Sequence, residues 1–129
     1  MAQGAGHERR VHERVDREVP VYYKFRHLDP RRRPEKLTYQ GVSKNFSRGG
    51  LSLVGPLPEA GWISSLLMSK ILLDLEIEWP GGRKFKAACR AAWVEARPGG
   101  EGQAMFGLTF TDLAPELRQD LERFMQEGT

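Results

Sequence analysis

The sequence is poor in cysteine, and this excludes disulfides and zinc-type sites. Cys89 is the only cysteine among 129 residues, so no disulfide can form within the chain. His7, His12 and His27 have no metal-binding residues around them in the sequence, so we expect them to be exposed and expect no metal or cofactor. Cys89 shares an apolar face with alanines, which favours the core over a role as nucleophile. A single cysteine also fits a reducing compartment, the cytoplasm.

Long apolar runs are absent as well. No stretch approaches the length of a membrane span, and the N-terminus lacks the apolar core of a signal peptide. No sequence context indicates a catalytic elbow or a Ser/His/Asp triad. We therefore expect a protein that does not insert into a membrane and is not an enzyme.

Excess positive charge is missing from most of the chain. Residues 1–40 hold ten Lys/Arg and six Asp/Glu, whereas residues 41–129 hold ten and eleven. The excess lies in an arm, residues 9–17, and in the cluster Arg31–Arg33. Such local charge indicates a local anionic target more than a broad nucleic-acid-binding face. For Arg31–Arg33 alone, a solvated loop is the simpler interpretation.

Short strands separated by Gly/Pro turns make up most of the chain. Apolar and acidic residues alternate with period two over residues 71–79, as in a half-buried strand. The expected strands are residues 19–25, 36–43, 71–79, 85–95 and 103–110. Trp93 is expected on the same buried face as Cys89, and all three tryptophans in the core. The pattern predicts a mainly β antiparallel sandwich or barrel.

The C-terminal segment changes to helical spacing. Leu113, Leu117, Leu121 and Phe124 recur at helical intervals, and Pro115 fits an early helical position. We expect one amphipathic helix that closes the carboxyl end of the domain.

Residues 57–70 are ambiguous. Trp62, Ile63, Leu66 and Leu67 fit a short helix, part of a strand, or a contact with a partner. Core packing is the simplest interpretation of these four side chains.

Two short motifs stand out in order along the chain. The first is Arg10-x-x-x-Arg14, within the charged arm, and the second is Asn45-x-Ser47-x-x-Gly50, ahead of an apolar run. On chemistry alone the second is a turn that leads into a strand, because Asn and Ser bond nearby backbone and Gly permits positive φ. A functional interpretation adds that Asn45 and Ser47 offer neutral donors and acceptors on the same side of an extended segment.

In this order the motifs strongly resemble those of the PilZ domain family. The resemblance covers roughly residues 8–126, and further matching stretches are Gly49–Leu53, Ala92–Val94, Phe106–Phe110 and Leu113–Leu117. It implies a six-stranded antiparallel Greek-key β-barrel with a C-terminal α-helix. It also implies a bacterial second-messenger receptor that binds cyclic di-GMP.

The resemblance assigns roles to individual residues. Arg10 and Arg14 would bind guanine and phosphate. The presence of Arg9 just before them implies that the ligand binds as an intercalated dimer. Asn45 would bond a guanine edge, and Ser47 the base or phosphate. The glycines of the motif, Gly49 and Gly50, would let the ligand approach the backbone.

These expectations define one domain with a mobile clamp. Residues 1–7 would be a disordered leader and residues 8–126 the domain, with residues 8–18 folding over the ligand and a downstream protein receiving the signal. Two alternatives are an adaptor of the same fold that binds no nucleotide and a basic-arm nucleic-acid binder. The sequence leaves monomer and homodimer open.

Overall fold

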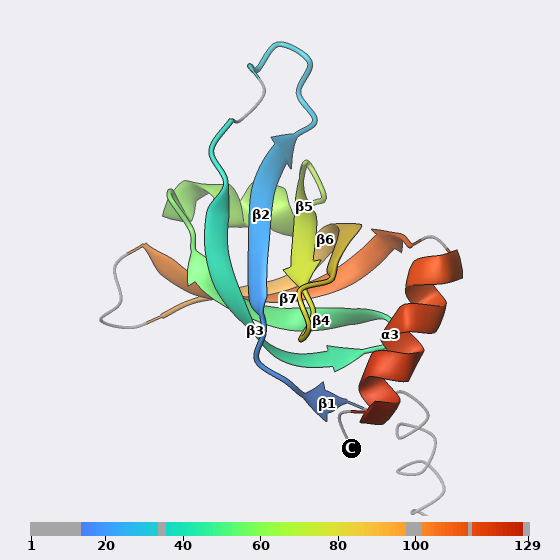
Figure 1. Ribbon diagram of the computed structural model, residues 1–129. Coiled ribbons are helices and arrows are strands. Elements are labelled where there is room, and N and C mark those ends of the chain that lie inside the picture. The colour runs from blue at the N-terminus through green and yellow to red at the C-terminus, as the bar shows by residue number, and fades with distance from the viewer. Residues whose placement is uncertain (1–13, 34–35, 98–101, 114, 128–129) are drawn as a thin grey trace, which may run out of the picture.

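Seven strands and three short or medium helices form the protein in a computed structural model that describes residues 14–33, 36–97, 102–113 and 115–127 (Figure 1). The strands are β1 Val15–Asp16, β2 Pro20–His27, β3 Tyr39–Ser47, β4 Gly50–Pro56, β5 Ile71–Glu78, β6 Lys84–Ala96 and β7 Gln103–Asp112. The helices are η1 Ala60–Trp62, α2 Ile63–Leu67 and α3 Pro115–Glu127.

Six strands close into a barrel. Around the barrel the order is β2, β3, β4, β7, β6, β5 and back to β2, and every pairing is antiparallel. Strands β5, β6 and β7 form a meander, and β4 returns beside β7, which is a Greek-key arrangement. The predicted six-stranded Greek-key barrel with a C-terminal helix is confirmed, with β1 as an extra strand on β3.

Alternation along the strands builds the core. In β5 the side chains of Ile71, Leu73, Leu75 and Ile77 are buried and the residues between them are half-exposed, as the period-two pattern predicts. Cys89 is fully buried within this core, and burial raises the pKa of its thiol to about 12. Its predicted place in the core is confirmed, and at neutral pH the thiol stays protonated.

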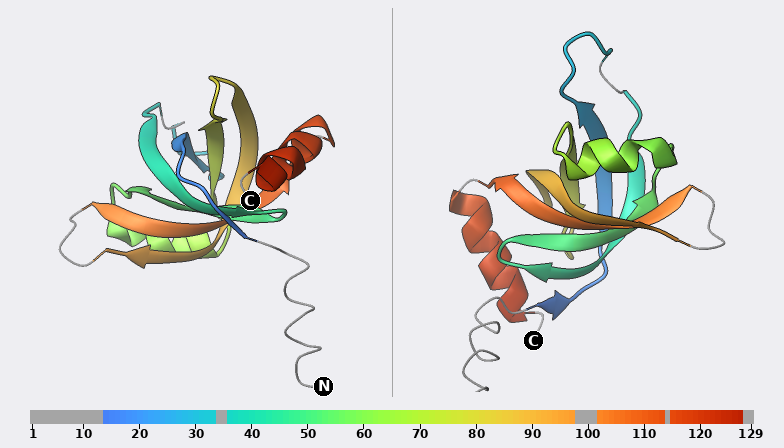
Figure 2. Two further views of the ribbon diagram at one scale, coloured as in Figure 1. Left: turned by 60° about the horizontal axis from the view of Figure 1, so that its bottom comes forward. Right: turned by 180° about the vertical axis from the view of Figure 1, so that it is seen from behind.

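The two helical regions lie on different sides of the barrel (Figures 1 and 2). Phe124 of α3 packs against Phe46 and Trp79, with ring centroids 5.3 and 3.7 Å apart. At the other region Trp62 packs edge-on against Phe25, with centroids 5.2 Å apart. Each helical region therefore adds an aromatic side chain to the barrel core.

The ambiguous residues 57–70 form a 3₁₀ turn followed by one turn of α-helix. Trp62 and Leu66 are buried, as core packing predicts, whereas the Leu67 side chain is 47% exposed. Trp62 also contacts the ring of His27 edge-on, with centroids 4.7 Å apart, and His27 is half-buried. The prediction that His27 is exposed is therefore wrong.

Two further sequence expectations are corrected by strand geometry. The second strand is not residues 36–43 but Tyr39–Ser47, because Asn45 and Ser47 pair with β4 instead of forming the turn. Trp93 is not in the core: β6 is irregular between Ala91 and Trp93, and this shift turns the indole to the outer face, where it is 41% exposed.

Candidate ligand-binding face

The two sequence motifs meet through the pairing of β1 with β3. Val15 lies opposite Phe46 and Asp16 opposite Asn45, so the same register extended by one residue brings Arg14 to Ser47. Arg14 is exposed. Arg9 and Arg10 lie outside the described residues. Arg14, the described end of the arm, therefore lies beside the Asn45-x-Ser47 segment.

Ser43 fixes the bend between β1 and β2. Its buried hydroxyl donates to the Arg17 carbonyl oxygen at 2.7 Å and accepts from the Val19 N–H at 3.0 Å. The backbone N–H of Arg17 donates to the Lys44 carbonyl at 3.2 Å. Because a buried polar group needs its partners, these bonds hold the base of the arm in one position on β3.

On the outer face of the barrel, strand pairing places one residue from each of β3, β4, β7 and β6 in a row. Asn45 on β3 pairs with Ser52 on β4, Ser52 pairs with Gly107 on β7, and Gly107 pairs with Trp93 on β6. Directly opposed residues of antiparallel strands share a face. Asp16 begins this row beside Asn45, so a carboxylate, an amide, a hydroxyl and an indole lie along one line.

A second row runs beside the first. Ser47 pairs with Gly50, Gly50 with Thr109, and Thr109 with Arg90 on β6. Arg90 is exposed, and the extended β1 register adds Arg14 at the other end. The row therefore has a guanidinium group at each end and small polar or glycine residues between them.

The glycines of this face differ in what surrounds them. A Cβ on Gly49 would meet nothing within 4 Å, so the backbone there is open to a ligand. A Cβ on Gly50 would collide with the Leu108 carbonyl, and one on Gly107 with the Trp93 indole. Neither Gly49 nor Gly50 has a positive φ. Gly50 thus has a packing reason to be glycine, independent of any ligand.

The two motif side chains are half-exposed. The Ser47 hydroxyl accepts a hydrogen bond from the Gly49 N–H at 3.3 Å, as in a serine turn. Within the described residues the Asn45 side chain has no hydrogen-bond partner. An amide at the surface without a protein partner is available to a ligand.

Helix α3 adjoins the hairpin that carries the motif. Arg48, in the β3–β4 turn, lies 3.7 Å from the Glu122 carboxylate. Arg17 places its guanidinium 5.0 Å from the centre of the Phe124 ring, within range of a cation–π interaction. Both the arm and the motif hairpin therefore contact the same helix.

Trp93 and Arg90 are the residues of this face that the sequence analysis missed. Simple alternation along residues 85–95 put Trp93 inside, and only the irregularity in β6 reverses it. The available signal was Gly107, because a glycine in a strand marks a close approach by another group, here the indole.

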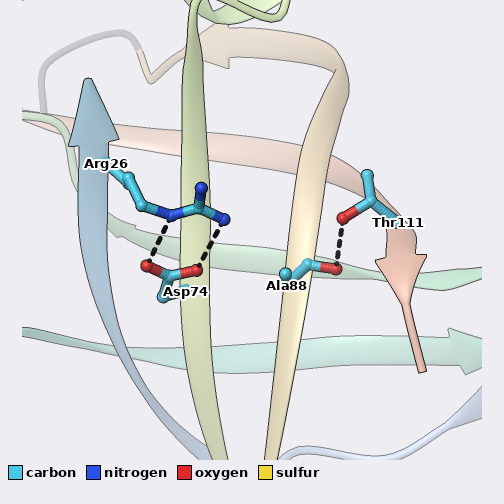
Figure 3. A network of polar contacts seen from close by, with 4 residues as sticks. All are labelled: Arg26, Asp74, Ala88 and Thr111. Carbon is cyan, nitrogen blue, oxygen red and sulfur yellow. Dashed lines mark hydrogen bonds and ion pairs between the residues drawn. The ribbon is translucent and has the colours of Figure 1, made fainter. Parts of the chain in front are cut away.

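Another side of the barrel carries a groove of about 630 Å³ along β2, β5 and β6, with none of the predicted site residues. One acid of its lining, Asp74, is paired: Arg26 donates to both of its carboxylate oxygens, at 3.0 and 3.2 Å (Figure 3). Beside it the Thr111 hydroxyl donates to the Ala88 carbonyl at 3.1 Å (Figure 3). The groove therefore lies apart from the Asn45-x-Ser47 segment of β3.

The part of the chain that the structure describes contains neither a metal-binding cluster nor a membrane-spanning helix. It contains no group of three or more His, Cys, Asp or Glu that could hold a metal ion. None of its helices has both the length and the apolar character needed to cross a membrane.

The model of the PilZ domain family matches residues 8–127, and the chain belongs to this family. PilZ domains are receptor and adaptor domains rather than enzymes, and many bind cyclic di-GMP. No curated protein matches the chain.

Solved structures share the fold at low sequence identity. The Bacillus subtilis inhibitor of motility MotI/DgrA superposes with a TM-score of 0.62 and 18% identity over 92% of this chain, which spans only 50% of that protein. The PilZ domain of Escherichia coli YcgR, solved with cyclic di-GMP, gives 0.59 and 14% identity, covering 92% of this chain and 90% of that one. Borreliella burgdorferi PlzA, in complex with cyclic di-GMP, gives 0.54 and 12%, covering 98% and 57%.

Proposed function

We propose that this protein is a receptor for cyclic di-GMP that binds the nucleotide on the outer face of β3, β4, β7 and β6 and relays the signal to a partner protein. One observation carries the proposal: β1 pairs with β3 so that the arginine arm starts beside Asn45 and Ser47. Residues far apart in the sequence are thereby arranged around one exposed surface. The family and the two relatives solved with cyclic di-GMP support the choice of ligand.

The residue types on this face match the chemistry of the ligand. A guanidinium can bond the guanine edge in a bidentate fork or pair with a phosphodiester, and the proposal gives these roles to Arg10 and Arg14. Asn45 and Ser47 supply uncharged donors and acceptors for the base. Trp93 offers an exposed indole on which a guanine can stack. Gly49 leaves its stretch of backbone uncovered.

The proposal also includes how many nucleotides bind. Arg9 would contact a second cyclic di-GMP stacked into the first, so two nucleotides would bind per chain. Arg90, which pairs with Thr109 at the far end of the second row, would meet a phosphate of either nucleotide. The protein would act in the cytoplasm, as a monomer or homodimer.

Titration calorimetry tests this function. Cyclic di-GMP is titrated into the wild type, Arg10→Ala/Arg14→Ala, Asn45→Ala and Trp93→Ala, with GTP and cyclic AMP as ligand controls. Losing one charge-assisted contact costs about 1.5–3 kcal/mol, so the double arginine variant should bind at least a hundredfold more weakly. Trp93→Ala should lose about 1–3 kcal/mol from stacking. Arg118→Ala, an exposed arginine on α3, is the matched control and should bind as the wild type does.

Each outcome has a defined meaning. Saturable binding at two nucleotides per chain supports the receptor with the stacked dimer, and one per chain removes the role given to Arg9. No binding by the folded wild type would refute the receptor and leave the adaptor as the function. Equal binding of GTP, with a steep fall in affinity as salt rises, would instead indicate non-specific phosphate binding.

A further inference from the structure

A second basic region projects from the barrel, away from β1 and the face described above (Figures 1 and 2). It consists of the chain that follows β2 and the turn that follows α2, and its described basic and exposed apolar residues are Leu28, Arg31, Arg32, Arg33, Lys36, Leu37, Met68 and Lys70. We call these residues the basic tip. The backbone N–H of Leu28 donates to the Lys70 carbonyl at 3.0 Å, which joins the two segments.

Within the part of the chain that the structure describes, most of the positive charge at the basic tip has no acidic partner. Asp29 pairs with Arg31, whose Nε lies 3.2 Å from a carboxylate oxygen, and this contact lowers the pKa of Asp29. Within the described residues the other cations form no ion pair, and they are Arg32, Arg33, Lys36 and Lys70. Glu35, the remaining acid of this stretch, lies outside the described residues.

Apolar side chains lie among these charges. Leu28 is 48% exposed, Leu37 61% and Met68 60%, and they are among the most exposed large apolar side chains of the described structure. Exposed leucine and methionine contribute little to binding a nucleic acid, whereas they can enter the headgroup region of a bilayer beside cations that meet its phosphates.

A groove of about 460 Å³ at the base of the basic tip could accept a lipid headgroup. Its lining includes Arg32, Trp62, Ser65 and Lys70, together with Asp29, whose carboxylate is paired with Arg31. The Arg32 guanidinium lies 5.6 Å from the centre of the Trp62 ring, which restrains this cation at the mouth of the groove. Two cations and a serine thus line a space in which the one acid, Asp29, is already paired with Arg31, so the lining favours an anionic group.

We propose that the basic tip is a peripheral docking surface for an anionic phospholipid membrane, on a different part of the barrel from the nucleotide-binding face. This inference does not depend on nucleotide binding. Electrostatic attraction brings the cations to the lipid phosphates, and the exposed Leu28, Leu37 and Met68 add contacts with the interface.

Sedimentation with lipid vesicles tests the proposal on the full chain without nucleotide. The wild type should bind vesicles of phosphatidylcholine mixed with phosphatidylglycerol and not vesicles of phosphatidylcholine alone. Each cation near the surface contributes about 1 kcal/mol, so Arg32→Ala/Arg33→Ala/Lys70→Ala should bind roughly a hundredfold more weakly. Lys84→Ala/Lys86→Ala/Arg118→Ala removes the same charge from other surfaces and should bind nearly as the wild type does. All six positions are exposed, so unchanged melting temperatures are expected.

A second variant separates lipid from other polyanions. Leu28→Ser/Leu37→Ser should weaken vesicle binding several-fold and leave any affinity for duplex DNA unchanged. Wild-type binding to anionic vesicles no stronger than to phosphatidylcholine overturns the proposal. Equal losses in the two triple variants, or DNA binding as tight as vesicle binding with no effect of the leucines, overturn it as well. Retention of cyclic di-GMP binding by the basic-tip variant would show that the two surfaces act separately.

Discussion

Two hairpins of the barrel hold α3 in similar ways. In the β3–β4 hairpin, Phe46 packs against the ring of Phe124 on α3. In the β5–β6 hairpin, Trp79 packs against the same ring. Each turn also supplies an arginine: Arg48 lies 3.7 Å from Glu122, and Arg83 lies 3.2 Å from Asp120. Helix α3 is therefore supported on two sides by the same combination of aromatic packing and an ion pair.

The hairpins differ in why each contains a Gly-Gly pair. Gly81 and Gly82 have φ values of +95° and +90°, and nothing lies within 4 Å of their Cβ positions, so backbone conformation requires them. Gly49 and Gly50 have no positive φ, and Gly50 is needed because the β7 backbone lies against it. The Gly-Gly pair of the β5–β6 hairpin thus allows the backbone conformation of the turn, whereas in the β3–β4 hairpin Gly50 allows close contact with β7.

The largest effect on stability is expected for Phe124 of α3, which contacts an aromatic residue from each hairpin. Phe124→Ala removes a buried ring that contacts Phe46, Trp79 and Arg17, and should lower the free energy of unfolding by about 3–5 kcal/mol. Urea unfolding followed by tryptophan fluorescence measures this. Arg118→Ala, on the exposed side of α3, should change it by less than about 0.5 kcal/mol. A small loss for Phe124→Ala would mean that α3 adds little to the stability of the barrel.

The next effect distinguishes the two glycines of the β3–β4 hairpin. Gly50→Ala forces a methyl group against the Leu108 carbonyl and should cost about 1–3 kcal/mol through overpacking. Gly49→Ala meets open space at an ordinary φ, and should be neutral or stabilising by up to about 1 kcal/mol. Equal effects at both positions in urea unfolding would contradict the close contact with β7.

A smaller effect is expected in the β5–β6 turn. Gly81→Ala or Gly82→Ala places a side chain in the left-handed region, at about 1–2 kcal/mol per residue, without any clash. Asparagine at either position should recover part of this loss, because Asn tolerates that region better than Ala. Thermal unfolding of the four variants measures the difference, and no recovery by Asn would indicate that the cost is not conformational.

The smallest effects are expected for the two arginines. The Arg48–Glu122 pair is half-exposed on both sides, so Arg48→Ala should change stability by less than about 0.5 kcal/mol. Arg83→Ala should cost more, up to about 1 kcal/mol, since Asp120 is only 19% exposed and Arg83 also stacks over Phe85 at 5.0 Å. Raising the salt concentration should reduce the difference between the two variants, and a larger loss at Arg48 would reverse this comparison.

The sequence predicted the barrel because its signals are local. Alternation over residues 71–79 and helical spacing near the C-terminus each depend on a few neighbouring residues, and both are confirmed. Trp93 was placed wrongly because an irregularity in a strand reverses a face without leaving a local pattern. The pairing of Asp16 with Asn45 could not be predicted either, since register between distant strands depends on the whole barrel.

The motif residues illustrate the same limit at the candidate site. Two arginines and an Asn-x-Ser stretch can be found by spacing alone, and their link to a ligand stays a prediction. The presence of Arg90 and Trp93 on the same face follows only from the pairing of β6 with β7. A search for motifs with fixed spacing along the sequence cannot find residues that separate strands contribute one at a time.

The pairing of β4 with β7 has a consequence for when the protein can become functional during its synthesis. Residues 50–56 pair with residues 103–109, and on the proposed nucleotide face this contact joins the half on β3 and β4 to the half on β6 and β7. A nascent chain that has not yet released its final strand from the ribosome holds only half of the face. Competence for the proposed nucleotide binding should therefore appear in one step, when the last strand of the barrel is in place.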